Sequence, residues 1–480
     1  MKTKPLILIL AVTVSLWLSS TVASAFTLPE LSPQSKACIA CHKVQSASVY
    51  DQWGKSKHFR GNIGCYECHA AGEKDSDAYE HFGELIATIV SPKDCGRCHE
   101  KEVSEFSKSH HAKGGRILGS LDNILAEVVE GNSGFVTSAH PHGVSAAAVN
   151  GCWQCHGSEV KVLKTGRLDP ATWPNTGIGR INPDGSEGSC TACHSRHAFS
   201  AAQARTPDTC GKCHMGPDHP QIEIFNESKH GIAYHANVDK MALDSAKWIV
   251  GEDYNAAPTC ATCHMSATKD QPVTHDIGLR ISWNNRPAIS VRPEISDAKM
   301  NLPGKDISWE TRRANMVNVC IACHNKNYVD AFYQQYDALI DLYHEKFAKP
   351  GLALYNAAQP LLTPPKFSNK IDFIWFEIWH HEGRRARHGA SMMGPDYTHW
   401  HGTYEVAKNF YTEYIPELKE LARHHLNSAD AEKKKAAEAL QKLIMNTLTG
   451  KNHQWFLNQM DPAEKARRDK AREEFTNRYK

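Results

Sequence analysis

The sequence of 480 residues has little net charge and no cysteine outside one short motif. Its 55 lysines and arginines nearly balance its 53 aspartates and glutamates, and the formal net charge of +2 argues against a nucleic-acid-binding protein. Strand signals are scarce throughout. Beyond the first 25 residues no hydrophobic run is long enough to span a bilayer, which excludes a polytopic membrane protein. The composition therefore predicts a soluble, mainly α-helical globular protein.

The single long apolar run lies at the N-terminus. Leu6 to Leu18 follows Lys2 and Lys4, and Ala23-Ser24-Ala25 has the small residues of a cleavage site. A membrane anchor is the alternative, but the run is short for a transmembrane span. We therefore expect residues 1–25 to be a secretory signal peptide, the mature chain to begin near Phe26, and the protein to be exported to the periplasm.

All 16 cysteines occur in pairs separated by two residues, and a histidine follows every pair. At this spacing both sulfurs lie on one side of a turn, where each can form a thioether with a haem vinyl group while the histidine reaches the iron. Zinc sites do not require the adjacent histidine, a thioredoxin motif would occur once, and a disulfide framework would not repeat one spacing eight times. We therefore expect eight covalently bound haem c groups. The eight units are Cys38/Cys41/His42, Cys65/Cys68/His69, Cys95/Cys98/His99, Cys152/Cys155/His156, Cys190/Cys193/His194, Cys210/Cys213/His214, Cys260/Cys263/His264 and Cys320/Cys323/His324.

The eight motifs are crowded into one part of the chain at unequal intervals. From Cys190 to Cys210 the first cysteines are 20 residues apart, and from Cys260 to Cys320 they are 60 apart, which argues against a solenoid. So many haems between Phe26 and the eighth motif must supply much of the apolar core. Irons this close together should form an electron-transfer chain.

The cysteine-free residues after the eighth motif have a helical pattern. Aromatic and aliphatic residues recur at helical spacing in residues 329–348 and 404–421, and residues 430–480 are rich in Ala, Lys, Glu and Leu. Pro350-Gly351 and Pro364-Pro365 are expected to end helices. We predict a haem-binding domain over residues 26–330 and a helical C-terminal domain over residues 331–480.

Twenty of the 28 histidines remain once the eight motif histidines are set aside. A haem with imidazole on both faces transfers electrons, whereas a haem with one open face can bind a small molecule. An enzyme with one open haem needs seven distal histidines, and an electron conduit with every haem capped needs eight. Twenty histidines are enough for either, so the count does not distinguish the two functions. Any single histidine can instead be a surface or hydrogen-bonded core residue. We favour His58, His111, His142, His197, His230, His275 and His388 as distal ligands, with His110, His140 and His381 as further candidates.

Longer motifs surround some of the haem units. They are GCWQCHG, TWPNTGIGR, CHSRHAFS and CHMGPDHPQ between Gly151 and His235, and PDYTHWHG at residues 395–402. Together with the eight units, they resemble the octahaem hydroxylamine oxidoreductase family over nearly the whole mature chain.

The resemblance implies roles that the spacing alone does not. The haem of the fourth motif is implied to be catalytic, with one histidine ligand, and the other seven to have two. Asp218 and His219 are implied to lie over its open face. The resemblance also implies a homotrimer in which the C-terminal domain contributes to the subunit interface and a tyrosine of a neighbouring subunit bonds covalently to the catalytic haem. We identify that tyrosine with Tyr397.

The chemistry of these residues agrees with the implied roles. Oxidation of hydroxylamine releases protons as well as electrons, and the ordinary pKa of histidine, about 6.5, suits His219 to the base. Asp218 can orient that imidazole or accept a second proton. Without the family, the Asp-His pair would be interpreted as a loop hydrogen bond and Tyr397 as a packed aromatic residue.

Three functions are open at this stage. Tyr397 favours oxidation, with hydroxylamine as the preferred substrate and hydrazine as the alternative. Reduction of nitrite or hydroxylamine to ammonia is the second function, and an electron conduit with every haem capped is the third. Electrons are expected to pass to a small soluble cytochrome or to a quinone-linked membrane protein.

Overall fold

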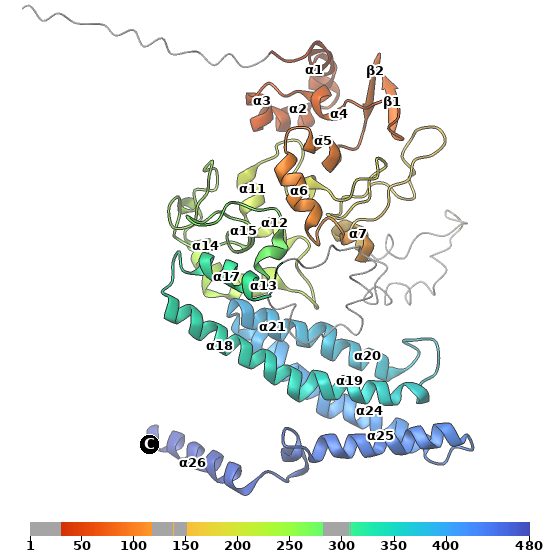
Figure 1. The fold of residues 1–480 in the computed structure, drawn as a ribbon, viewed down its shortest axis with the longest axis vertical. Coiled ribbons are helices and arrows are strands. Elements are labelled where there is room, and N and C mark those ends of the chain that lie inside the picture. The colour runs from red at the N-terminus through yellow and green to blue at the C-terminus, as the bar shows by residue number, and fades with distance from the viewer. Residues whose placement is uncertain (1–29, 118–137, 139–150, 282–306, 308) are drawn as a thin grey trace, which may run out of the picture.

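The computed structural model describes residues 30–117, 138, 151–281, 307 and 309–480. The expected signal peptide, His140 and His142 lie outside the described residues. The part that carries the haem motifs consists of short helices and long connections, and a bundle of longer helices lies beneath it (Figure 1). No helix in the described ranges combines the length and the apolar character that crossing a membrane would require.

The mainly helical fold is confirmed. One antiparallel sheet of two strands occurs within the described residues, β1 Ala78–His81 and β2 Glu84–Ala87. The strands are joined at Phe82 and Gly83, which both have positive φ (51° and 87°), as a tight hairpin turn requires. His81 is therefore the last residue of β1, directly before the turn.

Each haem motif begins on or beside a helical turn, which places its two cysteines on the same side as the sequence predicts. The α-helices of this part are α1 Pro33–Gln45, α2 Ala47–Gly54, α3 Lys57–Arg60, α4 Cys65–His69, α5 Pro92–Gly96, α6 Glu100–Lys108, α7 Gly114–Ile117, α10 Cys152–Cys155, α11 Ala201–Arg205, α12 Pro207–Gly211, α13 Gln221–Glu227, α14 Lys229–Ala236, α15 Cys260–His264 and α17 Trp309–Cys320. Short 3₁₀ helices span Cys190–Ala192, Val238–Lys240 and Ile277–Arg280.

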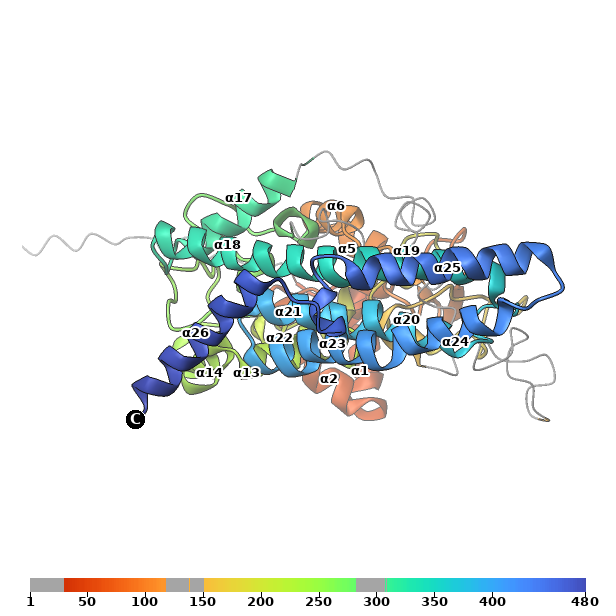
Figure 2. The same ribbon diagram turned by 90° about the horizontal axis from the view of Figure 1, so that it is seen from below.

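The C-terminal part has an apolar core of its own. Leu354, Ile378, Phe410, Leu418 and Leu440 are fully buried within it. Its α-helices are α18 Lys326–Tyr343, α19 Lys349–Ala358, α20 Lys370–Phe376, α21 Gly383–Met392, α22 Pro395–Thr398, α23 Glu405–Asn409, α24 Ile415–His425, α25 Ala431–Thr449 and α26 Pro462–Arg478, the last of which extends away from the bundle (Figure 2). Four π-helical turns, His344–Ala348, Glu377–Glu382, His399–Tyr404 and Phe410–Tyr414, and two 3₁₀ turns, Gln359–Leu361 and Gln454–Leu457, connect them.

The expectation that Pro350 and Gly351 end a helix is wrong. The π-helical turn His344–Ala348 joins α18 to α19, and Pro350 lies in the first turn of α19, where a missing N–H is tolerated. Gly351 serves close packing, because a Cβ there would lie 2.4 Å from a ring carbon of Trp375. The break expected at Pro364-Pro365 does occur, since residues 362–369 contain no helix.

A buried carboxylate lies at the end of the π-helical turn before α21. Glu382 is 4% exposed; its Oε1 accepts a hydrogen bond from Asn409, and its Oε2 has no hydrogen-bond partner among the described residues. Burial raises the pKa of Glu382 to about 7. An acid whose pKa is higher in the folded state than in the unfolded chain destabilises the fold increasingly as the pH rises between those two pKa values.

We predict that Glu382→Gln removes this pH-dependent cost. The variant keeps an oxygen for Asn409 and loses the charge, so it should be more stable than the wild type at pH 8, by about 1–3 kcal/mol, and nearly equal to it at pH 5. Thermal unfolding of the holoprotein, followed by far-ultraviolet circular dichroism at both pH values, measures the difference. An equal difference at the two pH values would contradict the assignment.

Candidate functional site

Five motif histidines face a second histidine at nearly the same separation. A metal–nitrogen bond of about 2 Å on each face, with roughly 1 Å from each nitrogen to its ring centre, puts two axial imidazole rings about 6 Å apart. The facing pairs, by the distance between ring centres, are His42–His81 at 6.1 Å, His69–His197 at 6.5 Å, His99–His58 at 6.2 Å, His194–His275 at 6.5 Å and His324–His230 at 6.0 Å. The residues present therefore fit iron centres with two histidine ligands.

Four of these facing histidines are candidates from the sequence: His58, His197, His230 and His275. Their assignment as ligands stays a prediction that the geometry favours. Sequence reasoning missed His81, the partner of His42. The only signal for it was the short His-Phe-Gly segment, which has too few residues to mark a hairpin clearly.

His214 of the sixth motif has two histidine neighbours. Its ring centre is 6.0 Å from that of His111 and 6.1 Å from that of His219. His111 also lies close to the seventh motif: burial, followed by the charges of His214, His110 and His264, lowers its pKa to about 3. An iron has one distal position, so at most one of His111 and His219 can face His214 across the same iron.

His388 and His381, two further candidates, lie in the C-terminal bundle. His388 on α21 is 6% exposed, and burial, followed by the charges of Arg387 and Arg384, lowers its pKa well below the ordinary value. His381 lies in the preceding π-helical turn, within the field of Asp218. His110 is exposed. Ligation by any of these stays a prediction.

Cysteines of different motifs lie against one another. Hydrogen bonds join the thiols of Cys95 and Cys190, of Cys155 and Cys213, and of Cys210 and Cys260, and they are the main reason that the pKa values of Cys95, Cys213 and Cys210 are raised. The attachment points of the third and fifth motifs are therefore adjacent, as are those of the fourth and sixth and of the sixth and seventh.

Three of the motif cysteines lie at the surface. Cys41, Cys98 and Cys323 are exposed, whereas the other motif cysteines are partly buried. In each of these three motifs the first cysteine is partly buried, and the second, three residues later, is exposed. Haem attachment at Cys41, Cys98 and Cys323 stays a prediction. A haem held there would have one edge near the surface, where electrons can pass to a partner.

The predicted Asp218–His219 pair lies beside the fourth motif, in the connection between α12 and α13. The charge of His219 helps to lower the pKa of Cys155, after the hydrogen bond from Cys213. Nδ1 of His219 lies 3.0 Å from Oδ1 of Asp218 and 2.9 Å from the carbonyl oxygen of Met215. Because both neighbours are acceptors, Nδ1 carries the proton, and Nε2 keeps its lone pair.

Two residues of the C-terminal part complete this cluster. Oδ2 of Asp218 lies 3.5 Å from Nη1 of Arg384 on α21 and 3.8 Å from Nδ1 of His380 in the π-helical turn before it. Sequence reasoning missed both, although the pairs His380-His381 and Arg384-Arg385 recur four residues apart. The C-terminal part thus contributes directly to the candidate site of the same chain.

The electrostatics of the cluster favour an ionised carboxylate. Burial alone would raise the pKa of Asp218, but the hydrogen bond from His219 and the charges of His219, His380 and Arg384 hold it well below its usual range. Burial likewise opposes the charged form of His219, whereas the hydrogen bond and charge of Asp218 and the carbonyl of Met215 raise its pKa overall. Burial lowers the pKa of His380 to about 2, so His380 is neutral.

Tyr397 lies on α22, beside α13 and the π-helical turn His399–Tyr404. The backbone N–H groups of Asp396 and Tyr397 donate to Oε1 of Glu227 at 3.1 and 3.2 Å, and the Tyr397 ring lies 5.4 Å from that of His401. Burial, followed by the charges of Glu223 and Glu227, raises the pKa of Tyr397. Its role towards a neighbouring subunit stays a prediction.

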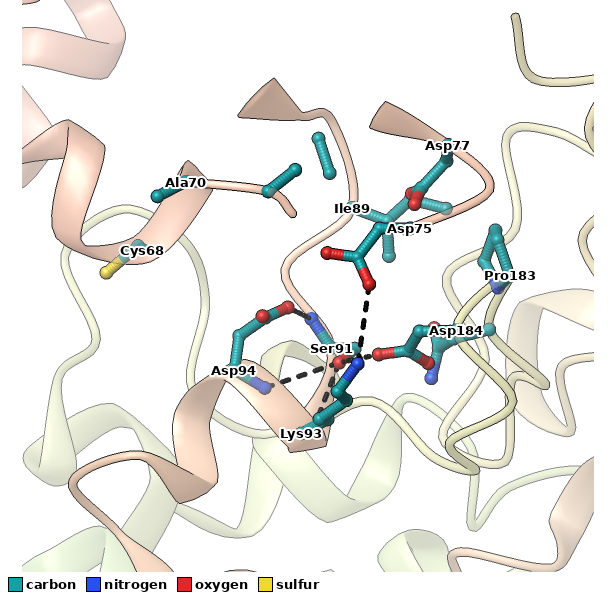
Figure 3. Close-up of a pocket in the computed structure, with 13 residues that line it drawn as sticks. Cys68, Ala70, Asp75, Asp77, Ile89, Ser91, Lys93, Asp94, Pro183 and Asp184 are labelled. Atoms are coloured by element: carbon teal, nitrogen blue, oxygen red, sulfur yellow. Dashed lines mark hydrogen bonds and ion pairs between the residues drawn. The ribbon is translucent and has the colours of Figure 1, made fainter. Parts of the chain in front are cut away.

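A separate polar pocket lies beside Cys68 of the second motif (Figure 3). Ser91 Oγ donates to Oδ2 of Asp184 at 2.6 Å, and the backbone N–H of Ser91 donates to Asp94 at 2.8 Å. Lys93 pairs with Asp75 at 3.4 Å. These contacts join the second and third motifs to the segment before the fifth. In the described part of the chain, no group of three or more His, Cys, Asp or Glu residues is arranged to hold a metal ion by itself.

The sequence of this chain is similar to those of multihaem cytochromes. Residues 183–349 match the family described as seven times multi-haem cytochrome CxxCH. The chain is 31% identical over 235 residues to a probable nitrite reductase-hydroxylamine oxidoreductase fusion protein of Kuenenia stuttgartiensis, covering 40% of this chain and 27% of that protein. It is 21% identical over 329 residues to the C-type polyheme cytochrome OmcC of Geobacter sulfurreducens, covering 61% and 37%. The chain thus spans well under half the length of these curated relatives.

Solved structures share the fold. A hypothetical multiheme protein matches with a TM-score of 0.67 and 28% identity over 83% of this chain and 98% of that chain. The Kuenenia stuttgartiensis reducing HAO-like protein complex Kustc0457/Kustc0458 matches with a TM-score of 0.50 and 18% identity over 87% of each chain, a likeness that shows the fold alone.

We predict that His81→Ala leaves one haem without its second imidazole. The iron held by His42 should change from low spin to high spin, because two histidine ligands enforce the low-spin state. Electron paramagnetic resonance of the oxidised holoprotein measures the change, and His424→Ala, at an exposed histidine of α24, is the control. Identical spectra for the His81 variant and the wild type would exclude His81 as a ligand.

Proposed function

We propose that the chain is a multihaem c-type cytochrome of the hydroxylamine oxidoreductase and nitrite reductase type and a periplasmic octahaem enzyme. The matches to multihaem cytochromes support this proposal. The proposed reaction is the oxidation of hydroxylamine, to nitric oxide or nitrite, at the haem of the fourth motif. The observation that carries the proposal is the Asp218–His219 pair beside Cys155, with Nε2 of His219 free to accept a proton.

Cys152, Cys155 and His156 would hold the catalytic haem, whose iron supplies a binding position for the substrate nitrogen and accepts its electrons. His219 takes protons from the substrate at Nε2. Asp218 fixes the Nδ1–H tautomer and stabilises the imidazolium once it forms, because the carboxylate stays ionised. The other seven motifs would hold relay haems.

The contacts between cysteines support a route for the electrons. Since Cys155 touches Cys213, electrons would leave the fourth haem through the sixth. Cys210 contacts Cys260, so the route would continue to the seventh haem. Cys320 lies near enough to Cys263 to influence its pKa, so the route would continue from the seventh haem to the eighth. A small soluble cytochrome or a quinone-linked membrane protein is the proposed acceptor.

Reduction of nitrite or hydroxylamine to ammonia is the second candidate function. It is favoured by the raised pKa of His219 and by the cation of Arg384 nearby, because reduction consumes protons and nitrite is an anion. Hydrazine oxidation is a third candidate that uses the same groups. In either oxidative reaction, Tyr397 of a neighbouring subunit in a homotrimer would bond to the catalytic haem.

The absorption spectrum of the reduced holoprotein tests the direction of the reaction. We expect a red-shifted ferrous band from a haem bonded to tyrosine, together with hydroxylamine oxidation. Tyr397→Phe should lose this band, and Tyr404→Phe, seven residues along the chain, should keep it. A wild-type protein without the band that rapidly reduces nitrite would establish the second candidate function instead.

We predict that His219→Gln lowers kcat about 10²–10⁴-fold without loss of haem, because the variant cannot accept a proton at this position. His235→Gln is the control, since His235 is exposed and its contacts are with Asn226, at 3.0 Å, and with the ring of Tyr234. Haem content by pyridine haemochrome and steady-state kinetics with hydroxylamine are the measurements. A control-like rate in the His219 variant would remove this residue from the mechanism.

The pH profile should distinguish oxidation from reduction. Oxidation requires the unprotonated form of His219, whose pKa is raised, so kcat should increase as the pH rises through a value above about 6.5. Reduction requires the protonated form, and its rate should fall over the same range. Rates with hydroxylamine and with nitrite, measured from pH 5 to pH 9, give the sign.

A further inference from the structure

The carboxylate of Asp218 is held on one side by its neighbour in the sequence and on the other by residues of the distant C-terminal part. Oδ1 faces Nδ1 of His219 at 3.0 Å, and Oδ2 faces Nη1 of Arg384 at 3.5 Å and Nδ1 of His380 at 3.8 Å. The side chains of Asp218 and Arg384 are only 21% and 19% exposed. More than 160 residues separate Asp218 from α21, so only the tertiary fold brings these groups together.

We propose that Arg384 is a positioning residue for the reaction, which holds Asp218 so that Nε2 of His219 faces the substrate. This inference rests on the proposed function of the fourth haem. It means that the proton-accepting site is completed by the C-terminal bundle of the same chain.

The scaffold around Arg384 suits a positioning role. Its guanidinium lies 5.4 Å from the ring centre of Trp379, which is 3% exposed. His380 stacks on Phe376, with 4.2 Å between ring centres and 18° between planes. Both groups are thus fixed by buried aromatic rings of α20 and the π-helical turn, and a group fixed in this way can orient its partner with little freedom.

The charges identify Arg384 rather than His380 as the decisive group. His380 stabilises the carboxylate of Asp218 only in its protonated form, and burial, followed by the charge of Arg384, lowers the pKa of His380 to about 2. At neutral pH, Arg384 is therefore the charged one of the two groups that face Oδ2. Arginine keeps its charge in a partly buried site. Arg384 adds to the hydrogen bond and the charge of His219, which are the larger influences that keep the pKa of Asp218 low, and its cation lies 3.5 Å from Oδ2.

Cyanide binding to the oxidised holoprotein is a test that does not depend on turnover. Hydrogen cyanide must lose its proton as it binds an open iron, so the rate of binding depends on the nearby base. We expect Arg384→Gln to slow cyanide binding and to lower kcat for hydroxylamine, each by about 10–100-fold, and Arg384→Lys to restore part of both. Arg385→Gln is the matched control, because Arg385 pairs with Glu405 at 2.7 Å and not with Asp218.

The double variant His219→Gln/Arg384→Gln separates positioning from a general structural effect. If Arg384 acts through His219, the double variant should bind cyanide no more slowly than His219→Gln alone. Additive losses would overturn the inference. If Arg384→Gln does not yield a haem-loaded protein, Arg384→Met can take its place in the double-variant comparison, because methionine keeps the aliphatic packing on Trp379.

The remaining outcomes separate this inference from the proposed function. Normal cyanide binding in Arg384→Gln, with slow binding in His219→Gln, would overturn the role of Arg384 and leave the function intact. A wild-type holoprotein whose spectrum does not respond to cyanide has no open iron, and this result would overturn the proposed function and the inference together.

Discussion

The attachment of two sulfurs and one imidazole to a single helical turn is the constraint on which the fold depends. The two cysteines and the histidine of a motif lie within five consecutive residues, so one helical turn is enough to present them to a haem. The motif-bearing part accordingly contains short helices such as α4, α10 and α15. Short helices bury little apolar surface of their own. The facing histidine pairs, about 6 Å between ring centres, indicate that haem fills the space between these elements.

The C-terminal bundle follows a different principle, since its stability comes from an apolar core that includes Ile378 and Leu418. That independent core gives it the rigidity to present polar groups. The π-helical turn before α21 carries His380, and α21 itself carries Arg384 to the carboxylate of Asp218. Extra residues in a helical turn commonly accompany functional sites, because they change the direction in which side chains point. The bundle thus holds His380 and Arg384 beside the carboxylate of Asp218.

How much could be predicted from the sequence depended on how local each feature is. The haem motifs, the helical class and the pair Asp218–His219 have signals within a few residues. His219 lies near enough to Cys155 to influence its pKa, and its position over a haem stays a prediction. His81 was missed because strands of four residues carry almost no pattern. Pro350 was misjudged because a preceding π-helical turn is invisible in hydrophobic periodicity. The meeting of Arg384 with Asp218 depends on tertiary packing, which no local pattern reports.

The close approach of cysteines from different motifs has a consequence for biogenesis. A backbone that closed before its haems were attached would bring the sulfurs of Cys155 and Cys213 together in an oxidising compartment. A disulfide between them would remove one attachment point from each of two cofactors, and exchange with neighbouring thiols could spread the error. Cofactor ligation while the polypeptide is still extended would keep such sulfurs apart. The compactness of the finished assembly therefore dictates the order in which the cell must build it.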